Sequence, residues 1–469
     1  MKYEMIVGLE THVELSTASK IFCACTTVFG GEPNTHCCPV CTGMPGSLPV
    51  LNARVVRYAA AAGLALGCEV QEHSVMSRKH YVYPDLPKAY QISQYDKPLC
   101  LGGGVTLSCG RTIGITRIHI EEDAGKLVHA GAELRMDYNR GGVPLIEIVT
   151  EPDFHSADEV LEYMEHLQNT LRAIGVSDCR MQEGSMRCDV NLSLRRPGET
   201  EFGVRSETKN LNSFSAVRAA IEYEYDRQAE LLDAGGAVVQ ETRGFDADTG
   251  ETSPLRDKEN ADDYRYFPEP DIITVRITEA EIEEIRAELP ELPDAKYRRY
   301  INELGIAEAD AKLLTKYRAV SEYFERAGDG ITPKSAAGFI VTNMFAHITT
   351  EADREHWNPS VTAEALNELL RMSESGKINK NTAKRVYAQM AEGAGRAADF
   401  VTEEDTAGIS EDALRALCEK AVAENSKSVS DFKAGKEKAL KAIVGAVMRE
   451  TRGRADALAA ERQILSLIG

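Results

Sequence analysis

The sequence predicts an α+β fold, in which a mixed, mainly antiparallel β domain precedes an all-α helical domain and a small helical tail domain. Residues 1 to about 290 contain five strand-like segments and little sign of regular βαβ alternation. From about residue 295 onward, the periodic segments are helical. Because 469 residues exceed the usual size of one domain, several domains are expected.

A proline-marked segment at residues 288–294 predicts the end of the β domain. A second boundary is expected near residue 405, where a stretch rich in Gly, Ala and acidic residues separates two helical regions. The predicted domains are therefore 1–292, 293–405 and 406–469.

The first predicted strand, residues 5–15, has two different faces. Side chains alternate with a period of two along a strand, so one face is apolar and the other carries Glu10, His12 and Glu14. Two carboxylates and an imidazole on one face are costly unless they are exposed, paired or bound to a cation. We interpret this row as one wall of a metal and nucleotide site.

The remaining strands are expected at residues 112–121, 143–149, 187–194 and 202–209. A helix between the third and fourth of the five strands is predicted to begin with a capping box of Ser156 and Glu159 and to end at Gly175. A further helix is expected from about residue 212 to the glycine pair at 235–236.

Several of these strands add acids and bases to the predicted site. The strand predicted at residues 112–121 ends in Glu121, Glu122 and Asp123. The polar face of the strand at 187–194 carries Arg187 and Asp189, and that of the strand at 202–209 carries Arg205, Glu207 and Lys209. Alternating acids and bases on one face are typical of a site that holds a metal and phosphates together. The alternative is a solvated sheet face with ordinary cross-strand ion pairs.

Four cysteines form two close pairs, Cys23 with Cys25 and Cys38 with Cys41. This spacing predicts a structural zinc site with four thiolate ligands. The adjacent Cys37 leaves the third ligand ambiguous, and the alternative is a set of buried or redox cysteines.

Net charge and hydropathy restrict the class of protein. The chain has 54 Lys and Arg against 74 Asp and Glu, a net charge of -20, so contact with nucleic acid must be local. No run of about 18 apolar residues occurs and the N-terminus lacks an apolar signal core, which predicts a cytoplasmic protein without membrane contact. No P-loop is present, so any ATP must be held by metal and basic side chains.

Two basic stretches are candidates for binding phosphates. Residues 77–91 combine Arg78, Lys79 and Lys88 with tyrosines such as Tyr81, which suits a polar substrate or a phosphate; the alternative is a loop in which the tyrosines simply pack. Residues 427–454 carry eight basic residues and three acidic ones, so RNA is expected to bind there. The alternative is a lysine-rich helix whose charged face is only solvated. Its lysines include Lys433, Lys436, Lys438 and Lys441.

Long motifs across the whole chain resemble the GatB/GatE family, the B subunits of glutamyl/aspartyl-tRNA amidotransferases. They include Gly8-Leu-Glu-Thr-His-Val-Glu-Leu15, Lys88-Ala-Tyr-Gln-Ile-Ser-Gln94, Glu121-Glu-Asp-Ala-Gly-Lys126, Arg140-Gly-Gly-Val-Pro-Leu-Ile-Glu147 and Glu207-Thr-Lys-Asn-Leu-Asn-Ser213. The resemblance implies a cradle-like catalytic domain, a helical domain and a tail that binds tRNA. It also implies Mg²⁺ in the cradle, held by Glu10, His12, Glu121, Glu122 and Glu207 with Asp189 nearby, and a zinc site that only some members have.

The reaction implied by the resemblance begins with ATP, which phosphorylates the side-chain carboxylate of Glu-tRNA(Gln) or Asp-tRNA(Asn); ammonia then displaces phosphate. Glu10, His12, Glu122 and Glu207 are the expected catalytic residues, and Arg78, Lys79, Tyr81, Lys88, Arg187, Arg205 and Lys209 are expected to bind ATP or substrate. Because no Ser-Ser-Lys amidase signature occurs, ammonia must come from a separate glutaminase A subunit, and a small C subunit completes the complex. The competing hypothesis is a non-catalytic, zinc-stabilised tRNA-binding scaffold.

Overall fold

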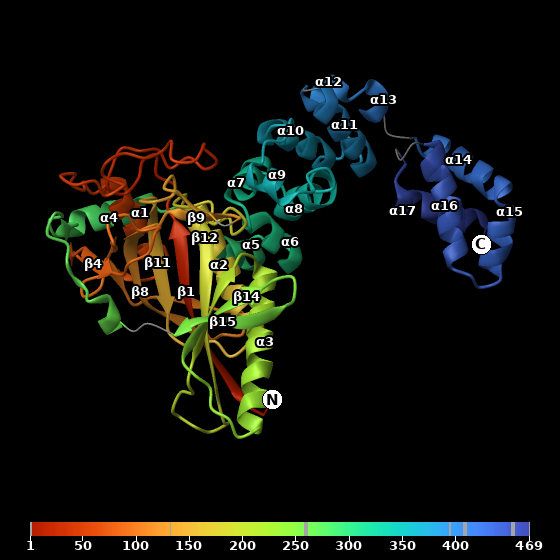
Figure 1. The fold of residues 1–469 in the computed structure, drawn as a ribbon. Helices are drawn as coiled ribbons and strands as arrows, with labels where there is room; N and C mark the ends of the chain where they lie inside the picture. Colours follow the sequence, from red (N-terminus) through yellow and green to blue (C-terminus); the bar gives the residue numbers. More distant parts are fainter. Residues whose placement is uncertain are drawn as a thin grey trace. The chain divides into compact units, whose positions relative to one another are not determined.

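The computed structural model describes residues 2–131, 133–257, 261–393, 395–406, 410–451 and 455–468, and it divides the chain into two compact units, Met1–Leu292 and Pro293–Gly469. The first unit is built on a sheet and the second is helical, which confirms the α+β class (Figure 1). None of the described helices is long and apolar enough to cross a membrane. The division into three domains stays a prediction, because compactness separates only two units.

Strand β1 (Glu4–Glu14) lies inside the ten-stranded main sheet, between β11 and β12 (Figure 1). The neighbours pair antiparallel except for β13 and β14, which are parallel. The other strands of this sheet are β2 (Glu69–Val70), β6 (Cys100–Leu101), β7 (Gly104–Thr106), β8 (Thr112–Glu122), β11 (Pro144–Thr150), β12 (Met186–Arg195), β13 (Ser206–Leu211), β14 (Glu241–Asp246) and β15 (Glu251–Asp257). All five predicted strands are present, although the last begins at Ser206 rather than at residue 202.

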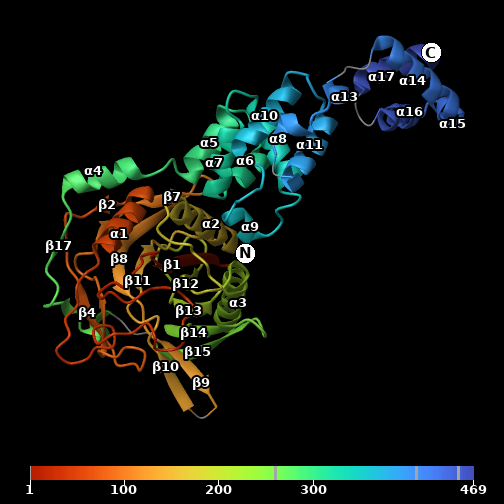
Figure 2. The same cartoon turned by 90° about the horizontal axis from the view of Figure 1, so that it is seen from above.

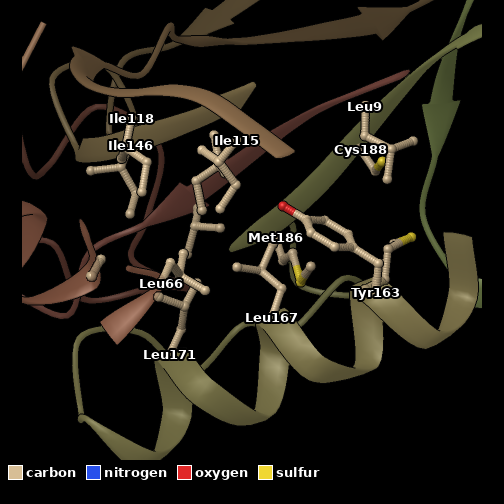
Figure 3. Packing of buried hydrophobic residues seen from close by; sticks show 14 of the residues in the cluster. Leu9, Leu66, Ile115, Ile118, Ile146, Tyr163, Leu167, Leu171, Met186 and Cys188 are labelled. Atoms are coloured by element: carbon tan, nitrogen blue, oxygen red, sulfur yellow. The ribbon is translucent and has the colours of Figure 1, made fainter. Parts of the chain in front are cut away.

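Helix α2 (Ala157–Ala173) covers one face of the main sheet. Its Tyr163, Leu167 and Leu171 are fully buried and point toward the strands, where Leu9 and Met186 contribute to the same core (Figure 3). The Ser156 side chain caps the helix as predicted, but the Glu159 carboxylate accepts from the His155 N–H, so the capping box is only half formed. Because α2 covers the apolar face, the polar side chains of β1 lie on the other face.

The remaining elements of the first unit surround this sheet. Helices α1 (Ala53–Ala65) and α3 (Phe214–Asp233) share its core, and α3 matches the second predicted helix. Figure 2 shows the hairpin of β9 and β10 extending away from the main sheet. The smaller elements are β3 (His73–Ser74), β4 (Ser77–His80), β5 (Tyr90–Ser93), β9 (Lys126–Ala130), β10 (Glu133–Asp137), the 3-10 turn η1 (Ala261–Tyr264), β16 (Phe267–Pro268), β17 (Val275–Arg276) and α4 (Glu279–Glu288).

The second unit has two separate clusters of buried side chains. The first cluster includes Tyr300, Phe324 and Leu366. The second includes Cys418, Ile443 and Ile464, so the tail has an apolar core of its own. The helices are α5 (Pro293–Asn302), α6 (Glu308–Thr315), α7 (Arg318–Ala327), α8 (Pro333–Phe339), the π-helical turn η2 (Ile340–Met344), α9 (Glu351–Glu355), α10 (Ala363–Glu374), α11 (Lys380–Gly393), α12 (Ala397–Phe400), α13 (Glu403–Thr406), α14 (Glu411–Glu424), α15 (Ser426–Lys433), α16 (Lys438–Glu450) and α17 (Ala457–Ile468).

Candidate metal and nucleotide site

The register of the main sheet gathers acidic and imidazole side chains around β1. Glu10 lies opposite Asp189 on β12, while His12 lies opposite Glu147 on β11. Glu147 in turn lies opposite His119 on β8. Side chains that are directly opposite on antiparallel strands share a face, so these residues form one charged sheet face.

His12, Glu121 and Glu147 form the first carboxylate group, in which one ligand atom from each residue lies within 4.8 Å of the others. The His12 Nε2 is 3.4 Å from the Glu147 Oε2. Ser93 Oγ donates a hydrogen bond of 2.6 Å to Glu121, and the buried His119 lies 3.2 Å from Glu121 and 3.4 Å from Glu147. The group therefore comes from three strands and is held by polar neighbours.

Glu147 was not identified from the sequence as a possible ligand. The signal was present, because Glu147 is the single charged residue of an otherwise apolar strand, Pro144–Thr150. An acid at such a position is buried and requires a partner. Only the pairing of β11 with β1 and β8 shows that its partners are His12 and His119.

Glu10, Asp189 and Glu207 form the second carboxylate group, again with ligand atoms within 4.8 Å of one another. The Lys209 Nζ lies 2.5 Å from Asp189 and 3.5 Å from Glu207, so an ammonium joins two of the three acids. Hydrogen bonds from neighbouring side chains also hold Glu10 and Glu207: Asn191 donates to Glu10 at 3.0 Å, and the Thr242 hydroxyl donates to Glu207 at 2.8 Å.

Electrostatic interactions keep the first carboxylate group ionised. Burial opposes ionisation of Glu147, but the neighbouring His119 and His12 hold its pKa well below the usual range. The pKa of Glu121 is also lowered, because Lys79 and His119 outweigh burial and the nearby Glu147. Burial disfavours a protonated His12, yet the Glu147 carboxylate raises its pKa. A cation would therefore compete with a proton at His12.

Lys79 and Tyr81 lie beside the first carboxylate group. Burial opposes a charged Lys79, but Glu121, Tyr266 and Glu147 raise its pKa well above the usual value. The Lys79 Nζ lies 4.9 Å from the ring centroid of Tyr264. The Tyr81 hydroxyl donates to Gln91 at 3.3 Å, and Gln91 in turn donates to Glu121 at 3.1 Å.

Glu122 lies outside both carboxylate groups, because consecutive side chains of β8 point to opposite faces. Its carboxylate oxygens are 2.5 and 2.6 Å from the Lys88 Nζ, and one of them accepts a 2.8 Å hydrogen bond from the Ile92 N–H. This ion pair lines a cavity of about 150 Å³ together with Phe22 and Cys41. The structure thus brings Glu122 to Lys88 rather than to His12.

The three predicted arginines have different surroundings. Arg78 binds the buried Glu269 through two hydrogen bonds of 2.7 and 2.9 Å. Arg187 is 3.0 Å from Asp123, whereas Arg205 is exposed immediately before β13.

Glu14, the third polar residue of the β1 row, shares a hydrogen bond with Asp123. Burial and this second carboxylate raise the pKa of Glu14 to about 8, against the opposing charges of Arg187 and Arg140. At neutral pH the pair therefore keeps a proton, which distinguishes Glu14 from the ionised acids farther along the charged sheet face.

Cys23, Cys25, Cys38 and Cys41 form the cysteine group, with sulfur atoms within 4.8 Å of one another. Cys38 joins the group, whereas the Cys37 sulfur lies 3.8 Å from Asn139. The sulfurs of Cys38 and Cys41 are 4.0 Å apart. Ligands at zinc–sulfur distances of about 2.3 Å in a tetrahedron are separated by about 3.8 Å, so the arrangement fits zinc.

One thiol of the cysteine group is strongly acidic. A hydrogen bond from Cys23 lowers the pKa of Cys41 to about 4 although burial opposes this, and the Cys38 N–H and Lys20 add to the effect. Thiolates are the form that binds zinc. The cysteine group therefore already contains one ligand in its metal-binding state.

The tail lysines, Lys433, Lys436, Lys438 and Lys441, are exposed on and between α15 and α16. Leu440, Ile443 and Val447 on the other side of α16 are buried, as its amphipathic pattern predicts. Two further bases of this stretch, Arg452 and Arg454, lie outside the described residues.

Comparison with known proteins shows the family to which the chain belongs. Residues 5–283, which contain both carboxylate groups and the cysteine group, match the model of the GatB/GatE catalytic domain, and residues 322–468 match that of the GatB domain. The chain belongs to the GatB/GatE family. The resemblance inferred from the motifs is therefore confirmed.

Close relatives of the chain within the GatB/GatE family are named as the B subunit of aspartyl/glutamyl-tRNA(Asn/Gln) amidotransferase. The chain is 50% identical over 465 residues to the protein of Thermoanaerobacter pseudethanolicus, with 97% of both chains covered. It is 48% identical to that of Carboxydothermus hydrogenoformans and 45% identical to that of Brevibacillus brevis, each covering 97% of this chain and 96% of the relative. The similarity thus extends over nearly the whole length of each protein.

Proposed function

We propose that this chain is the subunit of a tRNA amidotransferase in which the side-chain carboxylate of Glu-tRNA(Gln), Asp-tRNA(Asn) or both is activated and amidated. The observation that carries this proposal is the meeting of two carboxylate groups on one sheet face, next to Lys79 and Lys209. Membership of the GatB/GatE family supports the same function.

The proposed chemistry has two steps. An oxygen of the substrate carboxylate attacks the γ-phosphorus of ATP, ADP leaves, and an acyl phosphate is formed. Ammonia then attacks the acyl carbon, the bond to phosphate breaks, and the nitrogen loses a proton to give the amide. Because phosphoryl transfer requires mainly positioning and charge compensation, catalysis depends on the charged sheet face rather than on a nucleophilic side chain.

The residues fit Mg²⁺, because ionised carboxylates are the oxygen ligands that it prefers. The first carboxylate group would hold one ion and the second carboxylate group another, with Glu147 added to the residues predicted from the sequence. When bound, Mg²⁺ would neutralise the charge of the transferring phosphoryl group. His12 is an unusual ligand for Mg²⁺ and also suits Mn²⁺.

Basic residues on and beside the charged sheet face complete the proposed site. Lys79 lies where it can balance phosphate charge next to Glu121, and Tyr81 helps to orient Gln91. Lys209 already contacts Asp189 and Glu207, so it must shift when a cation enters the second carboxylate group. Arg205 is exposed and available to a polar substrate.

Three predicted residues have positioning roles in this proposal rather than direct ones. Glu122 positions Lys88 next to the cavity, and Arg187 holds Asp123 at the end of β8. Arg78 fixes β4, which carries Lys79, through its two bonds to Glu269.

The rest of the chain serves the same reaction. We propose that the first unit forms a cradle for the aminoacyl end and that the tail lysines bind the tRNA backbone. Zinc in the cysteine group would stabilise the loops around residues 23–41. A glutaminase A subunit would supply ammonia from glutamine, and a small C subunit would complete the heterotrimer.

The test uses the chain in complex with its A and C subunits. With ATP, glutamine and Glu-tRNA(Gln) or Asp-tRNA(Asn), we expect Gln-tRNA or Asn-tRNA to form, together with one ADP per amide. A complex that binds tRNA without transferring the γ-phosphate to the aminoacyl group would contradict the proposal. That outcome would support the non-catalytic, zinc-stabilised tRNA scaffold instead.

A further inference from the structure

Lys20 is a fully buried lysine, with 0% of its surface exposed. Its Nζ donates a 3.0 Å hydrogen bond to the Tyr138 carbonyl oxygen and lies 3.7 Å from the Cys41 sulfur. Among the described residues no carboxylate forms an ion pair with it, and the polar contacts of its ammonium are these two atoms. The anionic group nearest to this ammonium is therefore a sulfur of the cysteine group.

An ammonium ion without a counterion is costly to bury. Four thiolates and one Zn²⁺ carry a net charge of two negative units, so a loaded cysteine group needs a compensating cation as much as Lys20 needs an anion. The contact between Lys20 and Cys41 supplies both. Groups that contact the ligands of a metal, rather than the metal itself, commonly set the affinity of the site.

The same lysine connects the cysteine group to the strand connection after the β9–β10 hairpin. A Cβ built on Gly142 would lie 3.6 Å from both the Lys20 Cδ and the Cys41 Cβ. The Gly142 carbonyl accepts from the Ile21 N–H at 2.9 Å, and the Gly142 N–H donates to the Asp123 carbonyl at 2.8 Å. Lys20 and Cys41 thus pack against a backbone segment that is hydrogen-bonded to Asp123.

We propose that Lys20 is the positioning residue of the zinc site, where its ammonium binds the Cys41 thiolate and the Tyr138 carbonyl together. Zinc affinity and the order of residues 138–142 then depend on this one charge. The inference rests on the zinc site of the proposed function and is independent of the amidation chemistry. Failure of the amidation assay would leave it standing, because its test measures metal binding alone.

The experiment compares full-length wild type with Lys20→Met and Lys20→Arg. Competition with a chromophoric chelator gives the zinc dissociation constant of each protein. We expect Lys20→Met to raise this constant by about 10- to 100-fold, the usual effect of losing such a partner, and Lys20→Arg to recover most of the affinity because it restores the charge. Lys296→Met is the matched control, since it removes a lysine that is 12% exposed in the second unit.

Thermal unfolding with and without a zinc chelator separates coupling from a general packing defect. If the lysine acts through the metal, the rise in Tm produced by zinc is smaller in Lys20→Met than in wild type. An unchanged zinc dissociation constant, or the same loss of Tm with and without zinc, would overturn the proposal.

A measurement on the wild type covers the case in which the variants fail to fold. In protein labelled with ¹⁵N-lysine, the buried Lys20 ammonium should give a signal that exchanges slowly with water while zinc is bound. Chelation of zinc should abolish or shift that signal. A Lys20 signal that does not respond to removal of zinc would refute the inference.

Discussion

Glu121 and Glu147 on the charged sheet face are 2% and 7% exposed and lie against His119, whereas the tail lysines are exposed to solvent. Both sets are groups of charged side chains that lie close together. In the sheet, charge is buried, paired and shifted in pKa, which suits chemistry at a fixed point. In the tail, charge is solvated and screened, which suits contact with a polyanion. The two regions therefore differ in burial and pairing as well as in the sign of their charge.

The first prediction removes one charge from the sheet face. Glu147→Gln keeps the shape of the side chain but removes the negative charge next to His12. We therefore expect the rate of ATP-dependent phosphorylation of Glu-tRNA(Gln) to fall by about 10³-fold. Rapid-quench measurement of the acyl phosphate or of ADP release checks this. Affinity for tRNA should remain at the wild-type value, because the tail lysines are intact.

Glu151→Gln is the matched control for this variant. Glu151 follows β11 immediately, is exposed, and accepts a 2.7 Å hydrogen bond from the Thr116 hydroxyl. It should retain normal activity. If Glu147→Gln were as active as Glu151→Gln, the first carboxylate group would have no part in catalysis.

A smaller effect is expected from Lys79→Met. The lysine lies next to Glu121 and Glu147 and balances charge that a bound phosphate would add, so its loss should lower kcat for phosphoryl transfer by about 100-fold and change tRNA affinity little. Steady-state kinetics at saturating tRNA measure the effect. Lys97→Met, at an exposed position, is the control, and equal rates for the two variants would argue against a phosphate at Lys79.

The tail lysines test the other half of the comparison. Replacement of all four by alanine should weaken tRNA binding by roughly 10-fold or more and reduce the slope of log K against log salt by about 0.9 for each phosphate that the variant no longer neutralises. kcat at saturating tRNA should be unchanged. Binding at several salt concentrations measures both quantities, and an unchanged salt dependence would show that these lysines do not contact the tRNA backbone.

The smallest expected effect concerns pH and stability. The pKa of Glu14 is raised to about 8 in the folded chain, above its ordinary value of 4.5. The folded state therefore holds an extra proton between these values, so its stabilising contribution is complete below about pH 4.5 and is lost as pH rises through about 8. Glu14→Gln should remove this loss of stability at high pH.

Unfolding of wild type and Glu14→Gln between pH 5 and 9 measures this difference. The amide keeps the hydrogen bond to Asp123 without a titrating proton. Parallel pH profiles for the two proteins would show that the pair does not share a proton in the folded chain.

Much of the fold followed from local pattern. The alternation in residues 5–15 predicted both the strand and the face that carries Glu10 and His12, because the period of a strand is a local property. The spacing of the four cysteines predicted their grouping. Ser156 and Gly175 predicted where α2 begins and ends, because helix caps are also local signals.

Only the tertiary structure decided which charged residues meet. The pairing of β11 with β1 places Glu147 next to His12. Glu122 instead binds Lys88 and lines the cavity beside the cysteine group. The structure also brought Cys38 rather than Cys37 into the cysteine group, and it enclosed Lys20 beside Cys41. The physical reason is that sheet register and loop packing join residues far apart in the chain, whereas periodicity and spacing describe only near neighbours.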